Sequence, residues 1–455
     1  MDKVAIRIPD VPPGPSRLSA GLCVGYGVGM IGAQIFRDAP AFLLLIFMTD
    51  ALGIPGAMAG LAIFIPKIWV VFADPLAGIA SDRIDTRWGR RRPFMFAGAI
   101  LTGLGFIIMF NVPDLDSALA RAAYVCAAYT LALTAFAAYS VPYLTMGSEM
   151  AEGHHERTRL MAYRVGFMAA GLIVSGYAAR IREFGGAGEA GYSFAALVIG
   201  ALSAVTMLVT VFATGRAPFT RRHEAGPPLF EQFKLAWANR PFVMIFTAAF
   251  LERLAEGIGY AALIYFQTLV LGNSATVLGN MVFALCVPTI LGQPIWLAAC
   301  RRFGKRPTHV AALLLYCVAV SCWLLATPGQ AWITYVVAFF SGFLNSGFIL
   351  TALSMLTDAV AHDRKQTGLN REGAYTGVWL AGEKVAFALG TLIVGLLLSA
   401  FGYIESQGAA AAVQPASALT GITVAFIGLP IFFHLLSLIF VFRFRLPDGS
   451  HAGPA

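Results

Sequence analysis

Ten charged residues lie inside long apolar segments, and they are the first candidates for chemistry in this sequence. They are Arg37, Asp38, Lys67, Asp74, Arg164, Glu252, Arg253, Glu256, Glu383 and Lys384. A charge at the centre of a bilayer costs roughly 2.5–3.5 kcal/mol on insertion scales, so such residues generally face a cavity or a partner. Each could form a static ion pair between helices, or bind a solute, a cation or a proton. We expect at least some of them to be functional.

Lys67 and Asp74 form the most informative pair in this set. They stand seven residues apart, which is two helical turns, so they share one face of a helix. Asp74 is followed directly by Pro75. A carboxylate in this position could bind a cation, relay a proton or cap the neighbouring loop. Since the face away from lipid is the least costly place for two charges, we expect both to line an internal cavity.

The loop that follows this helix, "SDRIDTRWGRRRP", mixes acidic residues with a cluster of arginines. Its simplest role is to keep the loop on the cytoplasmic side of the membrane. A sharper interpretation is a charge network with helices 4 and 11 that breaks and re-forms during conformational change. The residues predicted to form this gating loop are Asp82, Arg83, Arg90, Arg91 and Arg92.

The composition indicates that these residues are positioned by membrane helices. Hydrophobic residues make up 58% of the 455 and charged residues 12%, and the mean hydropathy is +0.73. Soluble domains contain about a quarter charged residues, so this chain has too little polar surface to coat a soluble core. The prediction is an all-α integral membrane protein.

Twelve apolar segments have the length of about 20 residues that a spanning helix needs. They lie at about 18–48, 55–81, 93–111, 118–147, 159–180, 191–214, 241–271, 275–299, 307–327, 331–358, 372–402 and 418–442. The sequence therefore predicts twelve transmembrane helices in two six-helix halves. The predicted parts are a tail at 1–17, a bundle at 18–214, a linker at 215–240, a bundle at 241–442 and a tail at 443–455.

Basic residues predict the orientation of these helices. Most of the lysines and arginines outside the spans lie in the two termini and in alternate loops, whereas the opposite loops hold only Arg121, Arg180 and Arg182. Positive loops remain in the cytoplasm. The prediction is therefore a multi-pass protein of the cytoplasmic (inner) membrane, with both termini cytoplasmic, in contact with membrane lipids and not with nucleic acid.

Motifs of soluble enzymes and metal sites do not emerge from the sequence. The six cysteines stand singly, without CxxC or His/Cys ligand spacing, so we expect neither a disulfide nor a structural metal. No GxSxG, HExxH or Walker pattern occurs in a supporting context. The chain is predicted to be a non-enzyme without a cofactor.

An internal repeat and three motifs carry a family resemblance. "ADPLAGIASDRIDTRWGRRRPFMF" after helix 2 is echoed by "GQPIWLAACRRFGKRPTHVAAL" after helix 8, and a parallel repeat of six spans is the organisation of the major facilitator superfamily. "DPLAGIASDRIDTRWGRRRPF", "SVPYLTMGSEMAEGHHERTRLMAYR" and "REGAYTGVWLAGEKVAFALGTLIVGLLLSAFGY" resemble motifs of the glycoside–pentoside–hexuronide:cation symporters, the melibiose permease branch of that superfamily. The resemblance spans nearly the whole chain and implies a secondary transporter.

The resemblance also implies a sugar site near the middle of the membrane. In the permease, carboxylates of helices 1 and 4 and an arginine of helix 5 hold the sugar. Here the helix-1 position is Gln34, with Asp38 one turn further on, and the helix-4 position is Ser140. The arginine of helix 5 matches Arg164 and the lysine of helix 11 matches Lys384. Aromatic rings that could pack against a sugar complete the predicted substrate set with Tyr143 and Trp379.

The implied cation site has changed more than the sugar site. The family places two carboxylates one turn apart on helix 2, which here become Val70 and Asp74. One carboxylate is a poor Na⁺ site, although Na⁺ at Asp74 stays open. A buried carboxylate near a lysine suits proton exchange better. The predicted coupling residues are Asp74, Lys67 and Asp38, and either proton coupling or no coupling is expected.

The resulting prediction is a carrier that moves a glycoside or related small organic solute by alternating access. It is expected to act as a monomeric proton or sodium symporter. The alternatives are an exporter or carrier of amphipathic, lipid-like or acidic solutes, and an uncoupled facilitator. From other classes, a membrane sensor that lost transport and a polytopic transferase also remain open.

Overall fold

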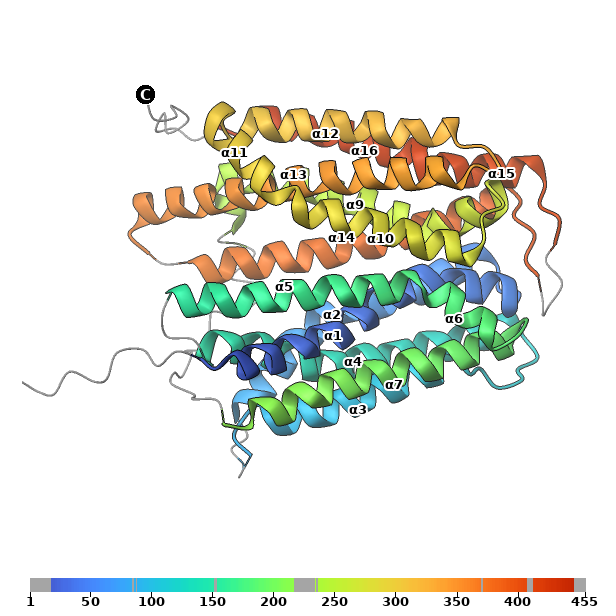
Figure 1. Ribbon diagram of the computed structural model, residues 1–455, viewed down its shortest axis with the longest axis horizontal. Coiled ribbons are helices and arrows are strands. Elements are labelled where there is room, and N and C mark those ends of the chain that lie inside the picture. Colours follow the sequence, from blue (N-terminus) through green and yellow to red (C-terminus); the bar gives the residue numbers. More distant parts are fainter. Residues whose placement is uncertain are drawn as a thin grey trace, which may run out of the picture.

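The computed structural model describes residues 18–83, 86, 88–150, 154–216, 234, 236–369, 371–406 and 412–445. They form long helices that run along a common axis (Figure 1). Nine of these helices are long and apolar enough to cross a membrane, and the number of spans rises to eleven if each of two bent pairs counts as one. The predicted tails and linker lie wholly or largely outside the described residues.

Six spans form the N-terminal half, where each apolar run must satisfy its backbone hydrogen bonds internally and therefore folds as a helix. They are α1 (Ala20–Ile46, extended by a π-helical turn at Phe47–Ala51), α2 (Gly56–Arg83), α3 (Arg92–Phe110), α4 (Ala118–Met150), the bent pair α5 (His154–Gly176) and α6 (Ala178–Phe184), and α7 (Glu189–Ala213). α1 packs against α5 and α7, α3 packs against α4 and α7, and α2 packs against α4.

The C-terminal half repeats this packing. Its helices are α9 (Arg240–Tyr265, extended by a π-helical turn at Phe266–Val270), the bent pair α10 (Ala275–Leu291) and α11 (Gln293–Phe303), α12 (Lys305–Ser321), α13 (Ala331–Thr367), α14 (Glu372–Ala400), and α15 (Ala416–Thr423) joined to α16 (Leu429–Arg443) by a third π-helical turn. α9 packs against α14 and α16, α12 against α13 and α16, and α10 against α13. Figure 1 shows the two halves as separate lobes, blue to green and yellow to red.

The helix α9 supplies the span that composition alone does not identify. It corresponds to the predicted span at about 241–271, but it carries Glu252, Arg253 and Glu256 and so is less apolar than the other spans. Glu252 is buried, and Arg253 and Glu256 are half-buried, because α9 packs between α14, α16 and α1. With α9 included, the helices account for the twelve predicted spans.

The first span of each half ends in the same local structure. The amides of Leu52 and Leu271 each donate to a carbonyl oxygen five residues back, at 3.1 Å. Each leucine precedes a glycine with positive φ, Gly53 at 60° and Gly272 at 64°, a conformation that other residues rarely adopt. The sequences "FMTDALG" and "FQTLVLG" share Phe, Thr, Leu and Gly at equal spacing. The internal repeat therefore extends to the backbone geometry.

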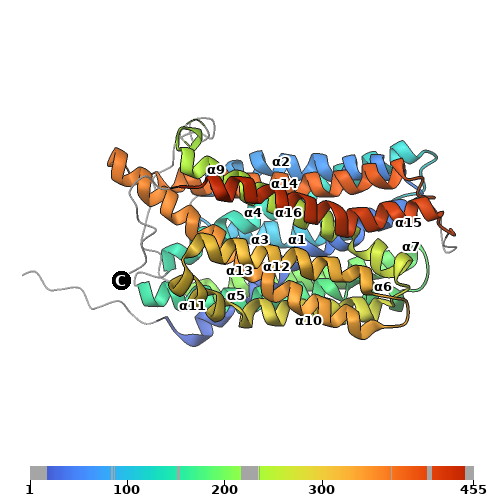
Figure 2. The same cartoon turned by 90° about the horizontal axis from the view of Figure 1, so that it is seen from above.

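The two halves meet where α2 packs against α14, where α5 and α6 pack against α10, and where α1 packs against α9, and Figure 2 shows α2 and α14 side by side. The first contact is close because both helices present glycine. A Cβ added to Gly395 would lie 2.4 Å from the carbonyl oxygen of Gly56, so a larger residue does not fit. Small residues allow helix backbones to approach in this way.

Polar contacts between the halves gather at the end of the bundle where α1 finishes. The hydroxyl groups of Thr49 and Tyr265 are 2.8 Å apart, one from each half. Tyr403 donates to the Asp50 carboxylate at 2.6 Å, and Ser406 donates to the Asp50 carbonyl at 3.1 Å. Burial raises the pKa of Tyr403, so its hydroxyl keeps the proton that it donates. This end of the bundle is closed by direct hydrogen bonds.

Candidate functional site

A buried carboxylate on α1 begins the polar region between the halves. The amide nitrogen Nε2 of Gln34 donates to Asp38 at 2.6 Å, and both side chains are buried. The Nε of Arg37 lies 3.5 Å from the same carboxylate, but the Arg37 side chain is 61% exposed, so this ion pair is weak. The predicted residues Gln34 and Asp38 thus form one hydrogen-bonded unit.

Lys67 on α2 reaches toward the other half. Its Nζ lies 3.4 Å from the Thr391 hydroxyl and 5.0 Å from the centre of the Phe387 ring, both on α14. Lys67 therefore lies at the contact between α2 and α14.

Asp74 and Lys384 form an ion pair between α2 and α14. Lys67 and Asp74 both face α14, as their spacing of two turns predicts. Val70, which stands between them where the family has a second carboxylate, is buried and offers no oxygen atom. Among the described residues, the ion-pair partner of Asp74 is therefore Lys384 of the other half.

A second group of charges lies within the C-terminal half. Arg253 on α9 pairs with Glu256 one turn further on, and its Nε donates to Glu383 on α14 at 3.2 Å. These three residues line a pocket together with Glu252 and Trp379, among others. The sequence marks the charges as unusual, but the predicted site includes only Trp379 from this group. The sequence signal that would have added these residues to the predicted site is the presence of three ionisable residues in the single span α9.

Aromatic stacking organises the predicted residues of the N-terminal half. The ring of Tyr143 stacks on Tyr26 at 4.6 Å, and its hydroxyl donates to the Tyr26 carbonyl at 3.2 Å. The Arg164 guanidinium lies 6.0 Å from the centre of the Tyr143 ring. Within the described residues, the buried Nε of Arg164 has no hydrogen-bond partner. Ser140 is half-buried on the same helix as Tyr143.

The predicted substrate residues therefore occupy several places. Contacts join Gln34 to Asp38, Tyr143 to Arg164, and Lys384 to Asp74. Trp379 is buried against Phe246 in the C-terminal half, at a ring separation of 6.4 Å. These groups belong to α1, α2, α4, α5 and α14, on either side of the line where the halves meet.

The predicted gating loop is anchored by two of its arginines. Arg91 contacts Asp82 at 3.3 Å and makes a two-pronged contact with Glu149 on α4 at 2.7 and 2.9 Å. Arg92 donates to the carbonyl of Thr214, just past α7, at 2.7 Å. Asp82 and Arg83 are exposed, and Arg90 is half-buried. The expected link to the fourth span, α4, is present. Arg92 adds a link to the end of the sixth span, α7.

The chemistry available to this region is that of carboxylates, cations, amides and aromatic rings. Among the residues that the structure describes, no group of three or more His, Cys, Asp or Glu side chains could hold a metal ion. All six cysteines are free. Such a region can bind a polar organic solute and can exchange a proton.

Comparisons with known proteins agree with this geometry. A family model described as MFS/sugar transport protein matches residues 25–448. An isoprimeverose transporter of Lactiplantibacillus pentosus is 24% identical, with 92% of this chain and 88% of the relative covered. The inner membrane symporter YicJ of Escherichia coli (strain K12) is also 24% identical, covering 92% and 90%. A crystal structure of a variant of the nucleoside transporter NupG matches with a TM-score of 0.70 at 13% identity, covering 92% of this chain and 99% of that one.

Proposed function

The chain belongs to the MFS/sugar transport protein family, and from this premise we propose that it carries a glycoside or a related sugar across the membrane as a cation symporter. It is a secondary transporter with the major facilitator fold. The isoprimeverose transporter among its relatives supports a sugar-like solute, and a relative named as a symporter supports coupling to a cation.

The observation that carries this proposal is the distribution of contacts between the halves. One end of the bundle is closed by hydrogen bonds such as Thr49 to Tyr265. Further along the same interface, Lys67 and Asp74 of α2 contact Thr391 and Lys384 of α14. A carrier that works by alternating access requires both features, a closable end and polar groups at the boundary of the two repeats.

The side chains at this boundary fit a polyhydroxylated solute. Carboxylates and amides such as Asp38 and Gln34 accept or donate hydrogen bonds to hydroxyl groups. Tyr143 and Trp379 offer rings for the apolar face of a sugar, one from each half. The substrate site proposed here consists of Gln34, Asp38, Ser140, Tyr143, Arg164, Trp379 and Lys384. The structure adds Arg253, Glu256 and Glu383 as candidates.

An acidic glycoside is the second candidate for the solute. The Nε of Arg164 is buried and has no hydrogen-bond partner among the described residues. A guanidinium matches the geometry of a carboxylate better than that of a single hydroxyl group. A hexuronide would supply this carboxylate, so hexuronides belong in the same uptake screen.

We propose the proton rather than Na⁺ as the coupling ion. Na⁺ needs several oxygen ligands, but Val70 removes one carboxylate and Asp74 is paired with Lys384. Protonation of Asp74 would release this pair and separate α2 from α14. In this proposal Asp74 exchanges the proton, and Lys67 and Asp38 lie along its path.

The setting of the protein follows from the same evidence. It is a multi-pass membrane protein. We propose that it resides in the cytoplasmic membrane with both termini in the cytoplasm, because most lysines and arginines outside the spans stand in the termini and in alternate loops. It is proposed to act as a monomer among membrane lipids, as a transporter rather than an enzyme.

Uptake by vesicles that contain the purified protein tests the proposal. Labelled glycosides, hexuronides and lysolipids are screened under imposed Na⁺ and pH gradients, applied separately. For one proton per solute, a gradient of one pH unit supports about tenfold accumulation. We expect Asp74→Asn to reduce this ratio to about one. Asp114→Asn, which alters an exposed carboxylate in the loop after α3, serves as the matched control and keeps the wild-type ratio.

Two results would contradict parts of this proposal. Uptake driven by Na⁺ and indifferent to a pH gradient would show that the loss of a carboxylate at Val70 is compensated elsewhere. Chemical conversion of the solute, visible by mass spectrometry, would indicate an enzyme instead of a carrier.

A further inference from the structure

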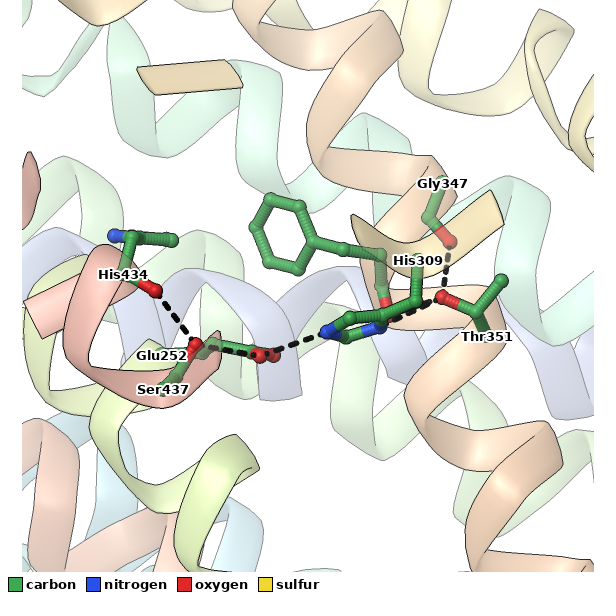
Figure 3. A network of polar contacts seen from close by, with 7 residues as sticks. Glu252, His309, Gly347, Thr351, His434 and Ser437 are labelled. Carbon is green, nitrogen blue, oxygen red and sulfur yellow. Dashed lines mark hydrogen bonds and ion pairs between the residues drawn. The ribbon is translucent and has the colours of Figure 1, made fainter. Parts of the chain in front are cut away.

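A buried network of polar side chains lies inside the C-terminal half, where α9, α12, α13 and α16 meet (Figure 3). Its centre is a contact of 3.0 Å between Glu252 Oε1 and His309 Nε2. Glu252 is 4% exposed and His309 is 0% exposed. A buried pair of this kind needs a complete set of hydrogen-bond partners, and the positions of its hydrogens can be worked out from those partners.

The imidazole of His309 is held at both nitrogens. Nε2 faces the Glu252 carboxylate, and Nδ1 lies 2.9 Å from the Thr351 hydroxyl. The same hydroxyl lies 2.9 Å from the carbonyl of Gly347, and both contacts are drawn in Figure 3. A hydroxyl group has one proton and can direct it to either neighbour. Thr351 can therefore act as an acceptor or as a donor toward His309.

Two hydrogen arrangements fit the same heavy atoms. In the first, Thr351 donates to Gly347, and His309 donates from Nδ1 to Thr351 and from Nε2 to Glu252, so the imidazole is protonated at both nitrogens. In the second, Thr351 donates to Nδ1, and His309 donates only from Nε2. The arrangements differ by the proton on Nδ1. When this proton is lost, the Thr351 hydroxyl turns from the Gly347 carbonyl toward Nδ1, and no other side chain has to move.

The carboxylate has a similar adjustable partner. The Ser437 hydroxyl lies 3.2 Å from Glu252 Oε1 and 2.7 Å from the carbonyl of His434. It can donate to the carboxylate when His309 carries one proton, and to the carbonyl when His309 carries two. Each end of the pair thus has a hydroxyl group that accommodates the gain or loss of a proton.

Other ionisable groups nearby have partners of their own. On the helices packed around the pair these groups are Arg253, Glu256, Lys305, Tyr316, Asp358, Glu383 and His434. Arg253 is engaged by Glu256 and Glu383, and Lys305 pairs with Asp358 at 2.7 Å. His434 uses Nδ1 to contact the carbonyl of Pro430 at 2.6 Å. When His309 carries two protons it is the cation that compensates Glu252, and with one proton the pair has a net buried negative charge.

Glu252 also connects this network to the region between the halves. It lines the same pocket as Arg253, Glu256 and Glu383, while its Oε1 contacts His309 on the other side. A proton arriving in the pocket therefore meets Glu252 before His309. One end of the buried pair therefore lies at the edge of the proposed substrate region.

We propose that Glu252 and His309 form a proton-binding site of the C-terminal half, with Thr351 and Ser437 as its adjustable partners. The ligand is a proton that the His309 imidazole holds beside the Glu252 carboxylate. The coupling of this proton to solute movement rests on the proposed function, whereas the binding of the proton does not.

The state of the His309 ring can be measured without any substrate. Protein with 15N-labelled histidine is placed in lipid nanodiscs, and His309→Gln identifies one resonance set among the seven histidines. We expect this ring to change between one and two N–H groups as the pH is varied over the range in which the protein stays folded. A ring that stays in one state throughout this range would overturn the proposal.

Thr351 provides a sharper variant. Thr351→Val keeps the side-chain shape but removes the hydroxyl group that both arrangements need, so we expect the change of ring state to be lost. Thr351→Ser restores a hydroxyl and should restore the change. Thr357→Val is the matched control on the same helix, because the exposed Thr357 hydroxyl contacts only its own helix at Ser354, at 2.7 Å. If Thr351→Val titrates like wild type, the assignment of roles in the network is wrong.

Transport assays then test the coupling. In vesicles, the ratio of pH-driven accumulation to counterflow is compared for wild type, His309→Gln and Thr357→Val. A selective fall of this ratio in His309→Gln supports coupling through the buried pair, and an unchanged ratio overturns it. If wild-type protein moves none of the solutes tested, the proposed function fails, and the ring measurement still decides whether the proton site exists.

Discussion

The two halves carry equivalent ion pairs at the end where α2 and α10–α11 finish, but they bury them differently. In the N-terminal half, Arg91 makes two hydrogen bonds with Glu149, and the side chains are 5% and 1% exposed. In the C-terminal half, Lys305 contacts Asp358, and the side chains are 37% and 32% exposed. Arg91 and Lys305 stand at the same place in the repeated motifs "GRRRP" and "GKRP".

The next basic residue of each motif also makes a contact that is more buried in the N-terminal half. Arg92 donates to the carbonyl of Thr214 at the end of α7, and Arg306 donates to the carbonyl of Phe442 near the end of α16, at 2.7 and 2.5 Å. The first contact is partly buried and the second is exposed. The repeat thus preserves the connections, whereas burial makes the N-terminal loop the firmer of the two.

The largest difference between the halves is expected in the stability that is lost when the carboxylate of each ion pair is neutralised. Glu149→Gln leaves the buried Arg91 guanidinium with only the exposed Asp82 carboxylate as an anion, so the free energy of unfolding should fall by about 3–5 kcal/mol. Asp358→Asn should lower it by less than about 1 kcal/mol because its partner is accessible to water. Unfolding in detergent micelles, followed by circular dichroism, measures both. Equal losses would mean that burial does not distinguish the halves.

A smaller difference is expected for the second basic residue. Arg92→Ala removes a charged hydrogen bond from a partly buried carbonyl and should cost about 1–2 kcal/mol. Arg306→Ala should cost less than about 1 kcal/mol, since the equivalent carbonyl is exposed. The same unfolding measurement applies, and a larger loss for Arg306→Ala would reverse the comparison.

The smallest effect should come from making the C-terminal pair resemble the N-terminal one. Lys305→Arg offers Asp358 a planar, two-pronged donor and should stabilise the protein by about 0.5 kcal/mol. A matched change in the opposite direction, Arg91→Lys, should destabilise it by more than that, because the buried Glu149 would lose one of its two hydrogen bonds. If both changes have equal and small effects, the geometry of the guanidinium is unimportant here.

The sequence alone predicts most of the fold. Apolar length predicts twelve spans, and the structure has a helix or a bent pair of helices at each of them, including α9 with its three charged residues. The bends between α5 and α6 and between α10 and α11, of 46° and 44°, were not predicted. Pro294, at the start of α11, is a local cause for the second bend, but its direction depends on packing between helices.

The candidate site is less predictable from the sequence. Helical periodicity places Lys67 and Asp74 on one face, and the structure shows that this face contacts α14. Spacing cannot name the partner of Asp74, because Lys384 is distant in the chain. The pair of Glu252 and His309 escaped prediction for the same reason. His309 stands in a basic segment, "GKRPTHV", and only tertiary packing brings it to a carboxylate.

The glycine contact between α2 and α14 has a mechanical consequence. Gly56 and Gly395 bring the two backbones together at one end of the helix pair, and Asp74 lies about 27 Å further along α2 at 1.5 Å per residue. Two backbones without intervening side chains can rotate against each other with little repacking. The contact between Gly56 and Gly395 can act as a pivot, about which the far part of α2 moves relative to α14. A tilt of about 5° at the glycines therefore becomes a displacement of about 2 Å at Asp74, enough to break its direct contact with Lys384.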